Sequence, residues 1–184
     1  MRADYRVFID ACVLANHGVC DLLLRLSERP RLIVPQWSEA VLEEVRRTHA
    51  NKLNWPQHLV DHFQGEIRRS FPEAEVSNFE SLIDSLEVDP KDRHVLAAAI
   101  RGNCQLVLTF NLRHFPKEKT EVWGVDVAHP QDYLKVLYEM EPKLVIGRLG
   151  EIAGRRGIEI EDVLIRLGKS LPAFSSLVLD DLES

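Results

Sequence analysis

Hydrophobic residues along the chain gather in four short runs that are separated by longer amphipathic stretches. The runs are aliphatic or β-branched and span residues 5–9, 31–34, 105–109 and 125–128. The first and third runs are almost continuously apolar, as is typical of strands buried on both faces. Helical patterns occupy about 17–28, 38–50, 56–70 and 90–102. Strands that alternate with helices predict an α/β fold, in which a central parallel sheet lies between helices in three αβα layers.

The last quarter of the chain has helical patterns and no strand-like run. Pro130 begins a helix that continues to about Glu139, and Pro142 starts another. Residues 143–184 predict two or three short helices with a break at 168–172. This stretch is too short to bury a core of its own. We therefore expect a domain at 1–138 and a helical appendage at 139–184 that packs on it.

Length and composition are those of a globular protein. The 184 residues are enough for one well-buried domain, and 45% are hydrophobic and 28% charged. No apolar run approaches the ~20 residues that a membrane helix needs, and Met1 is not followed by a secretory leader. The three cysteines form no CxxC pair, and their odd number argues against a disulfide framework. These observations predict a cytoplasmic protein without membrane contact.

The net charge of −6 restricts the possible partners. Nonspecific binding to nucleic acid is driven by neutralisation of phosphates, which favours a basic surface. The acidic surplus therefore leaves two explanations. Either the partner is not a nucleic acid, or the acids gather in a metal site and local basic patches bind the nucleic acid. Such patches occur at residues 46–47, 68–69, 113–119 and 155–156. A solvated helix face or loop is the better explanation of any single patch.

Asp10 is the first candidate site residue, because it directly follows the apolar run Val7-Phe-Ile9. A carboxylate there lies at the carboxyl edge of the sheet, where open α/β folds build their sites. An Asp that caps the following turn explains the residue equally well.

Glu44 is the second candidate. Ser38 is a good N-cap, and a helix after it buries the stripe formed by Trp37, Val41, Val45 and, at its edge, Leu42. Glu43 then points almost opposite the stripe, and Glu39 points well away from it. Glu44 lies at the border, so it is the acid of the three that could face a cleft. A surface Glu paired with a neighbouring Arg is the simpler alternative.

Asp92 is the third candidate, in the stretch Asp89-Pro-Lys-Asp92. Asp89 is a natural N-cap, Pro90 suits the first helical position and Asp92 falls at the capping-box position, so helix initiation explains both acids. A carboxylate in a first helical turn is also held rigidly. Of the two, Asp92 is the better ligand candidate, because Asp89 is expected to be engaged in the cap.

Thr109 and Asn111 complete the set. The run 105–109 ends in Thr109, and Asn111 follows two residues later. Their side-chain oxygens are expected at the same edge of the sheet as Asp10. A polar strand exit with an Asx turn is the alternative explanation.

The order of these residues resembles the PIN-domain family, and in particular the VapC-type toxins of bacterial toxin–antitoxin pairs. The resemblance covers about residues 4–138 and is carried by residues 8–14, 37–45, 89–99 and 107–116. Asp10, Glu44 and Asp92 match the family's metal-site acids. Position 111 is often Asp in the family and is Asn here, which removes one negative charge and leaves the number of ions open. His114 stands where relatives often have another Asp, and no role is assigned to it. The tail resembles the C-terminal extension of a subset of these toxins.

The resemblance implies a metal-dependent endoribonuclease, the toxin of a type II toxin–antitoxin pair. Neighbouring carboxylates repel one another, and a hard divalent cation relieves the repulsion. Mg²⁺ is the default, with Mn²⁺ as a substitute. Thr109 or Asn111 could orient the attacking water, and Arg93 or Arg113 could contact RNA phosphates. The expected partners are the RNA substrate, a cognate antitoxin that covers the active groove, and a second copy in a homodimer.

Other classes of site fit less well. His58 and His62 are four residues apart, but the HExxH pattern of a zinc site is absent. The turn after Asp10 lacks the glycines of a dinucleotide-binding fold, and no P-loop is present. Cys12 lacks a His–Asp companion pattern that would support it as a nucleophile. The remaining rival is a PIN fold that has lost catalysis and serves as an RNA- or protein-binding scaffold, and Asn111 is the one feature that favours it.

Overall fold

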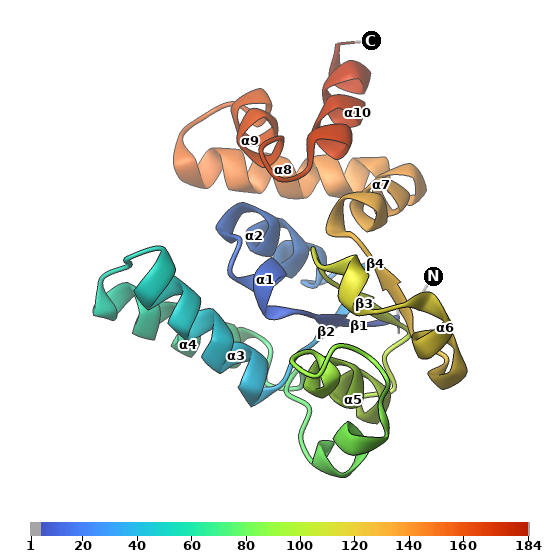
Figure 1. Ribbon diagram of the computed structural model, residues 1–184. Coiled ribbons are helices and arrows are strands. Elements are labelled where there is room, and N and C mark those ends of the chain that lie inside the picture. The colour runs from blue at the N-terminus through green and yellow to red at the C-terminus, as the bar shows by residue number, and fades with distance from the viewer. Residues whose placement is uncertain (1–4, 184) are drawn as a thin grey trace.

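Four strands form one parallel sheet in the computed structural model, which describes residues 5–183 (Figure 1). They are β1 (Arg6–Ile9), β2 (Val34–Gln36), β3 (Leu106–Leu108) and β4 (Asp126–Ala128), in the order β2-β1-β3-β4. All neighbouring pairs are parallel. The predicted α/β class with a central parallel sheet is confirmed.

The positions of the strands in the sheet explain their residues. The central strands β1 and β3 are buried at Val7–Ile9 and throughout Leu106–Leu108, which accounts for their continuous apolar runs. The predicted strand at 31–34 was wrong in its bounds, because the strand begins at Val34 and includes Pro35. Proline has no N–H to give to a neighbour, and β2 lies at the edge of the sheet, where proline is tolerated.

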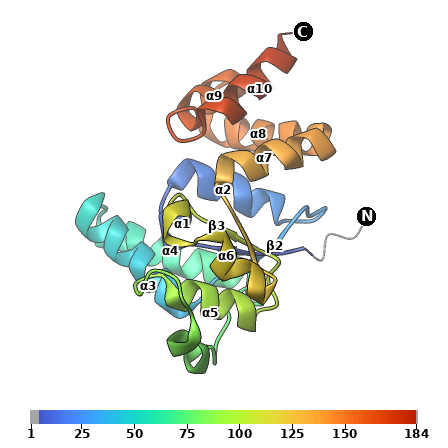
Figure 2. The same ribbon diagram turned by 45° about the vertical axis from the view of Figure 1, so that its right-hand side comes forward.

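Helices cover both faces of the sheet (Figures 1 and 2). The first half of the chain contributes α1 (Ala11–Leu14), α2 (His17–Leu26), α3 (Glu39–Arg47), α4 (Gln57–Ser70) and α5 (Arg93–Arg101). In both views α2 lies on one side of the sheet and α5 on the other. Short elements that the periodicity did not predict complete the connections. They are a π-helical turn η1 (Thr48–Lys52), the 3₁₀ segments η2 (Glu80–Ser85), η3 (Leu112–His114) and η4 (Glu121–Trp123), and α6 (Lys117–Thr120).

Four helices end the chain: α7 (Pro130–Met140), α8 (Pro142–Arg156), α9 (Ile160–Leu167) and α10 (Pro172–Leu182). A proline begins three of them, where its missing N–H costs nothing. Buried residues of α8, α9 and α10 belong to the same hydrophobic cluster as the central strands. The predicted division of the chain after residue 138 stays a prediction.

Buried arginines join α8 to α2. Arg25 donates to Asp21 Oδ1 at 2.9 Å and to Glu151 Oε2 at 3.3 Å. Arg148, which is 7% exposed, donates from Nη2 to the backbone carbonyls of Glu28 and Arg29, each at 3.1 Å. A buried guanidinium is stable only when its donors find acceptors, so these contacts fix the position of α8 on the rest of the molecule.

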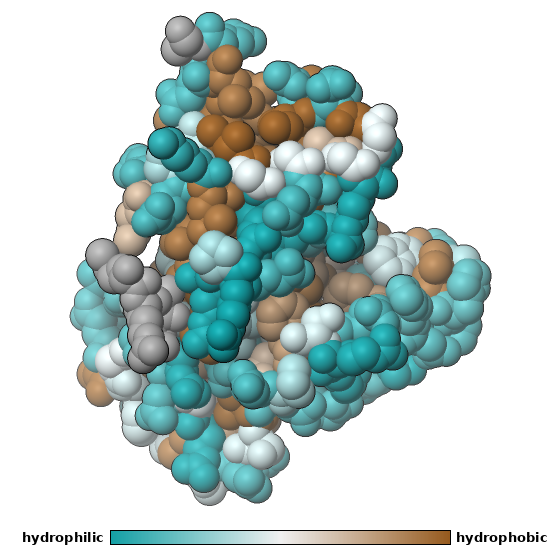
Figure 3. Space-filling model, turned by 180° about the vertical axis from the view of Figure 1, so that it is seen from behind, coloured by the Kyte–Doolittle hydropathy of each residue, from teal (hydrophilic) through white to brown (hydrophobic). Residues whose placement is uncertain are grey.

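Some apolar side chains remain on the surface. Seen from behind, hydrophobic residues gather over the C-terminal helices near the end of the chain (Figure 3). Val136 and Met140 of α7 are 49% and 58% exposed, and Leu182 of α10 is 37% exposed. Within residues 5–183, no helix combines the length and the apolar character that crossing a membrane requires.

Candidate functional site

Asp10 lies at the point where β1 passes into α1, and its carboxylate is almost fully buried. Its backbone N–H donates to the carbonyl of Leu108 at 3.0 Å, which ties it to the end of β3. Oδ1 accepts the N–H of Ala11 at 2.7 Å as the N-cap of α1. Oδ2 accepts the hydroxyl of Thr109 at 2.7 Å. The sequence left a cap and a site residue as alternatives, and the geometry allows both, because Oδ1 accepts a single hydrogen bond and keeps a free lone pair.

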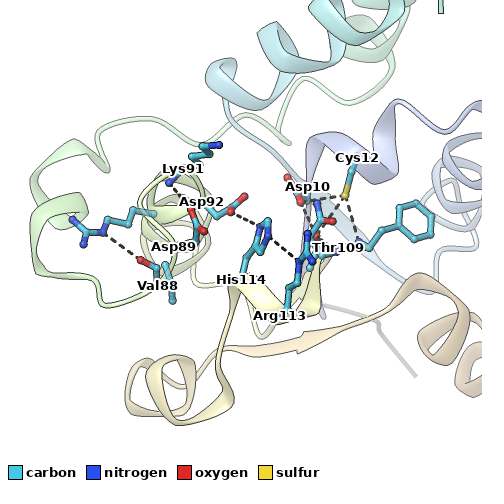
Figure 4. A network of polar contacts seen from close by, with 12 residues as sticks. Asp10, Cys12, Val88, Asp89, Lys91, Asp92, Thr109, Arg113 and His114 are labelled. Carbon is cyan, nitrogen blue, oxygen red and sulfur yellow. Dashed lines mark hydrogen bonds and ion pairs between the residues drawn. The ribbon is translucent and has the colours of Figure 1, made fainter. Parts of the chain in front are cut away.

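Thr109 and Cys12 surround Asp10 (Figure 4). Thr109 is fully buried, and its Oγ1 also accepts the N–H of Asn111 at 3.1 Å. The thiol of Cys12 lies 3.3 Å from Asp10 Oδ2, and its sulfur accepts the N–H of Phe110 at 3.4 Å. Burial, followed by the charge of Asp10, raises the pKa of Cys12 to about 12. The thiol therefore stays protonated at neutral pH, which excludes an activated cysteine nucleophile.

Asp92 lies just before α5, which begins at Arg93 and not at Pro90 as predicted. Asp89 does not cap this helix either. Its carbonyl accepts the N–H of Asp92 at 2.8 Å and its Oδ1 accepts the N–H of Lys91 at 3.0 Å, so residues 89–92 form a turn. Asp followed by Pro favours such a turn as well as a helix start. The carboxylate of Asp92 makes no cap and is available for other contacts.

His114 contacts Asp92, with Nδ1 2.9 Å from Oδ2 (Figure 4). Arg113 Nε lies 3.3 Å from His114 Nε2 and can only donate. His114 Nε2 is therefore the acceptor, and His114 Nδ1 carries the proton that faces Asp92. Burial, and then the charge of Asp10, raise the pKa of Asp92, while His114 opposes the shift. Asp10 and Asp92 therefore lie close enough to repel each other, although they are far apart in the sequence.

Glu44 faces α5 from α3. The predicted stripe of Trp37, Val41, Leu42 and Val45 is fully buried, Glu43 pairs with Arg46 and Arg47, and Glu39 pairs with Arg68. The partner of Glu44 is not an Arg but His94, whose Nε2 lies 2.9 Å from Oε1.

His94 was not identified from the sequence, and its place two residues after Asp92 is the signal that could have found it. Burial lowers its pKa, but the hydrogen bond and charge of Glu44, with the charges of Asp10 and Asp92, outweigh burial and raise the pKa overall. The imidazole thus lies within the field of all three predicted metal-site acids. The structure brings Asp10, Glu44 and Asp92 into one electrostatic neighbourhood.

The remaining candidates lie at the margin. Asn111 precedes η3, and its side chain makes no cap to that segment. Arg113 is exposed, and Arg93 Nε lies 3.5 Å from the carbonyl of Val88. Their predicted contacts with RNA stay predictions.

The donors suit a hard divalent cation. The carboxylates of Asp10 and Asp92 and the hydroxyl of Thr109 offer the oxygen ligands that Mg²⁺ and Mn²⁺ prefer, and the imidazoles of His94 and His114 lie beside them. Among the described residues, the ligand atoms of Asp89, Asp92 and His114 all lie within 4.8 Å of one another, and Asp10 and Glu44 are outside that set. Asp92 belongs to both groups, so it is the ligand on which a metal site here would depend.

No protein-family model matches the sequence. A segment of 101 residues is 33% identical to a protein of Mycobacterium tuberculosis (strain ATCC 25618 / H37Rv) described as "Putative ribonuclease VapC50". The match covers 53% of this chain and 60% of that protein, so it spans less than two thirds of the relative. The four-stranded parallel sheet is consistent with a PIN-like fold. The identity and the fold together support a PIN-like family of VapC type.

Proposed function

We propose that this chain is a divalent-metal-dependent endoribonuclease and the toxin of a type II toxin–antitoxin pair. The observation that carries the proposal is the position of Asp10 at the end of β1, hydrogen-bonded to Thr109 at the end of β3, with Asp92 near enough to feel its charge. Crowding of carboxylates is costly without a compensating charge, and a bound cation would supply that charge. The similarity to a VapC protein supports the choice of RNA as the substrate.

Asp10, Asp92 and Glu44 are the residues that would hold Mg²⁺, or Mn²⁺ in its place. When bound, the cation supplies charge neutralisation and Lewis acidity toward the phosphodiester. Thr109 fixes the carboxylate of Asp10 by donating to Oδ2, and His114 restrains Asp92 in the same way. Such contacts from neighbouring residues orient ligands and are needed for affinity.

Water and phosphate would be oriented by polar groups beside the acids. The hydroxyl of Thr109 is buried and donates a hydrogen bond to Asp10, so Thr109 acts as a positioning residue. Asn111 is partly exposed at the same strand end and is the better candidate to hold the attacking water. Arg113 and Arg93 are the proposed contacts to RNA phosphates, as guanidinium groups suit phosphate oxygens.

An antitoxin and a second copy of the chain are the proposed protein partners. The exposed apolar side chains of Val136, Met140 and Leu182 support the C-terminal helices as the location of the proposed interface. Light scattering after gel filtration measures the mass of the chain alone. A monomer at micromolar concentration would contradict the homodimer.

Cleavage of total RNA in Mg²⁺ or Mn²⁺, with an EDTA control, tests the proposed activity. Asp10→Asn and Asp92→Asn should abolish cutting, since each removes a negative charge with little change in shape. Glu44→Gln should weaken it, and Glu43→Gln is its matched control, because Glu43 pairs with the surface residues Arg46 and Arg47. If the wild-type protein cuts no RNA in either metal, the scaffold alternative is correct. Asn111, in place of the family's usual Asp, is the observation that favours that alternative.

A further inference from the structure

A cavity lies between the start of α2 and the C-terminal helices α8 and α9. Its volume is about 150 Å³, and Asn16, Arg156, Arg166 and Ser170 provide its polar lining. Among the residues that line it in the described part of the chain, none is Asp or Glu. In a chain with a net charge of −6, a hollow lined by two guanidinium groups favours an anion, and of the two only Arg156 is paired with a carboxylate, that of Asp21. We name it the α2–α9 pocket.

The start of α2 adds backbone donors to this pocket. The first N–H groups of a helix have no partner within the helix, and the side chain of Asn16 accepts only the N–H of Val19, at 3.3 Å. Gly18 also lines the pocket, and a methyl group of Leu167 lies 3.3 Å from the position that a Cβ would take there, so Leu167 packs against this glycine. The positive end of the α2 dipole acts in the same direction as the two arginines.

The two arginines of the pocket differ in the contacts that they make. Arg156 donates from Nη2 to Asp21 Oδ2 at 3.0 Å, which holds its guanidinium at the wall of the pocket. Arg166 is exposed on α9, and its guanidinium makes no hydrogen bond or ion pair among residues 5–183. Asn16 Nδ2 donates to Ser170 Oγ at 2.8 Å and so links the two walls. One fixed and one free guanidinium suit a phosphate group, whose oxygens accept paired N–H donors.

The pocket lies close to Asp10, whereas Asp92 lies just before α5, on the other side of the sheet from α2. Asp10 is the N-cap of α1, and Asn16 is the N-cap of α2. Only α1 separates them, and its four residues span about 6 Å. Figure 1 shows α8 and α9 directly beyond α2 as seen from α1. The start of α2 is thus close enough to Asp10 for one strand of RNA to reach both.

We propose that the α2–α9 pocket binds a backbone phosphate of the RNA next to the cleavage site. The inference rests on the proposed function and deepens it, because it gives the C-terminal helices a part in substrate binding. Arg166 of α9 would supply a contact that residues 1–138 lack. The base attached to the bound phosphate is not selected by this contact, since phosphate contacts carry no sequence information.

Arg166→Gln tests the pocket, with Lys169→Gln as the matched control. Both residues are exposed and both changes remove one positive charge, but Lys169 does not line the pocket. Fluorescence anisotropy in EDTA would measure the dissociation constant of a labelled single-stranded RNA at several salt concentrations. One phosphate contact contributes about 0.7 to the logarithmic salt slope, which is about fivefold in affinity at 0.1 M salt. We expect that loss for Arg166→Gln, less than twofold for Lys169→Gln, and substantial recovery with Arg166→Lys.

Equal losses of RNA affinity in Arg166→Gln and Lys169→Gln would overturn the proposal, because they would reflect the overall charge and not the pocket. So would an unchanged salt slope in Arg166→Gln. Either result leaves the nuclease proposal intact if the wild-type protein cuts RNA in Mg²⁺. Conversely, a fivefold loss specific to Arg166→Gln in a protein that binds RNA without cutting it would uphold the pocket and reject the nuclease.

Discussion

The hydroxyl of Thr109 offers a direct test of how the site is built, through Thr109→Val. Valine has almost the shape of threonine but cannot donate to Asp10 Oδ2, which accepts this hydroxyl at 2.7 Å. A hydrogen bond to a charged group contributes about 1.5–3 kcal/mol to the free energy of unfolding. The N–H of Asn111 also loses its acceptor, but this residue is partly exposed and water can replace the contact. We expect a loss of about 2–3 kcal/mol.

Thermal and urea unfolding would measure this loss. For a protein of this length, a loss of about 3 kcal/mol lowers Tm by about 6–12 °C. Thr109→Ser keeps the donor and removes one buried methyl group, so it should cost only about 1 kcal/mol. If Thr109→Val is as stable as Thr109→Ser, the hydroxyl does not hold Asp10 and its role as a positioning residue is refuted.

Three further predictions follow from buried groups. Burial raises the pKa values of Cys12, Cys20 and Cys104 to about 12, so iodoacetamide at pH 8 should label none of them until urea unfolds the chain. Because the folded-state pKa of Asp92 is raised, the folded chain binds more protons than the unfolded chain, and its stability without metal should fall as pH rises from about 4 through that pKa. Asp92→Asn should flatten this part of a Tm–pH curve, and an unchanged curve would contradict the shift. Arg148→Ala removes a buried guanidinium and leaves its carbonyl acceptors without a partner, so it should lower the free energy of unfolding in urea by about 2–4 kcal/mol. The same change at the exposed Arg155 should lower it by less than about 0.5 kcal/mol.

Periodicity predicted the main elements because their residues are buried on a regular side. The continuous apolar runs of β1 and β3 and the stripe on α3 are consequences of burial that any sequence must show. The short elements carry no such period and were missed. The bounds of α5 were wrong because Asp89-Pro90 favours a turn as well as a helix start, and only the contacts of Asp92 distinguish them.

The candidate site was predictable as an edge of the sheet but not as a set of contacts. Asp10 and Thr109 were predicted because they lie at the ends of strands. Glu44 was predicted from its position around the helix relative to the buried stripe. His94 and His114 could not be assigned roles, because their partners Glu44 and Asp92 lie on other elements and are brought near only by the packing of α3 and η3 around α5. The α2–α9 pocket depends on residues of α2 and α9 that are far apart in the sequence, which no local pattern connects.

A crystal soaked in Mn²⁺ and measured at the manganese edge tests the central claim most directly. We predict an anomalous peak that Asp10 and Asp92 both contact, with Glu44 as a ligand or linked to it through water. A peak held by Asp89, Asp92 and His114 without Asp10, or no peak at this edge of the sheet, would contradict the account.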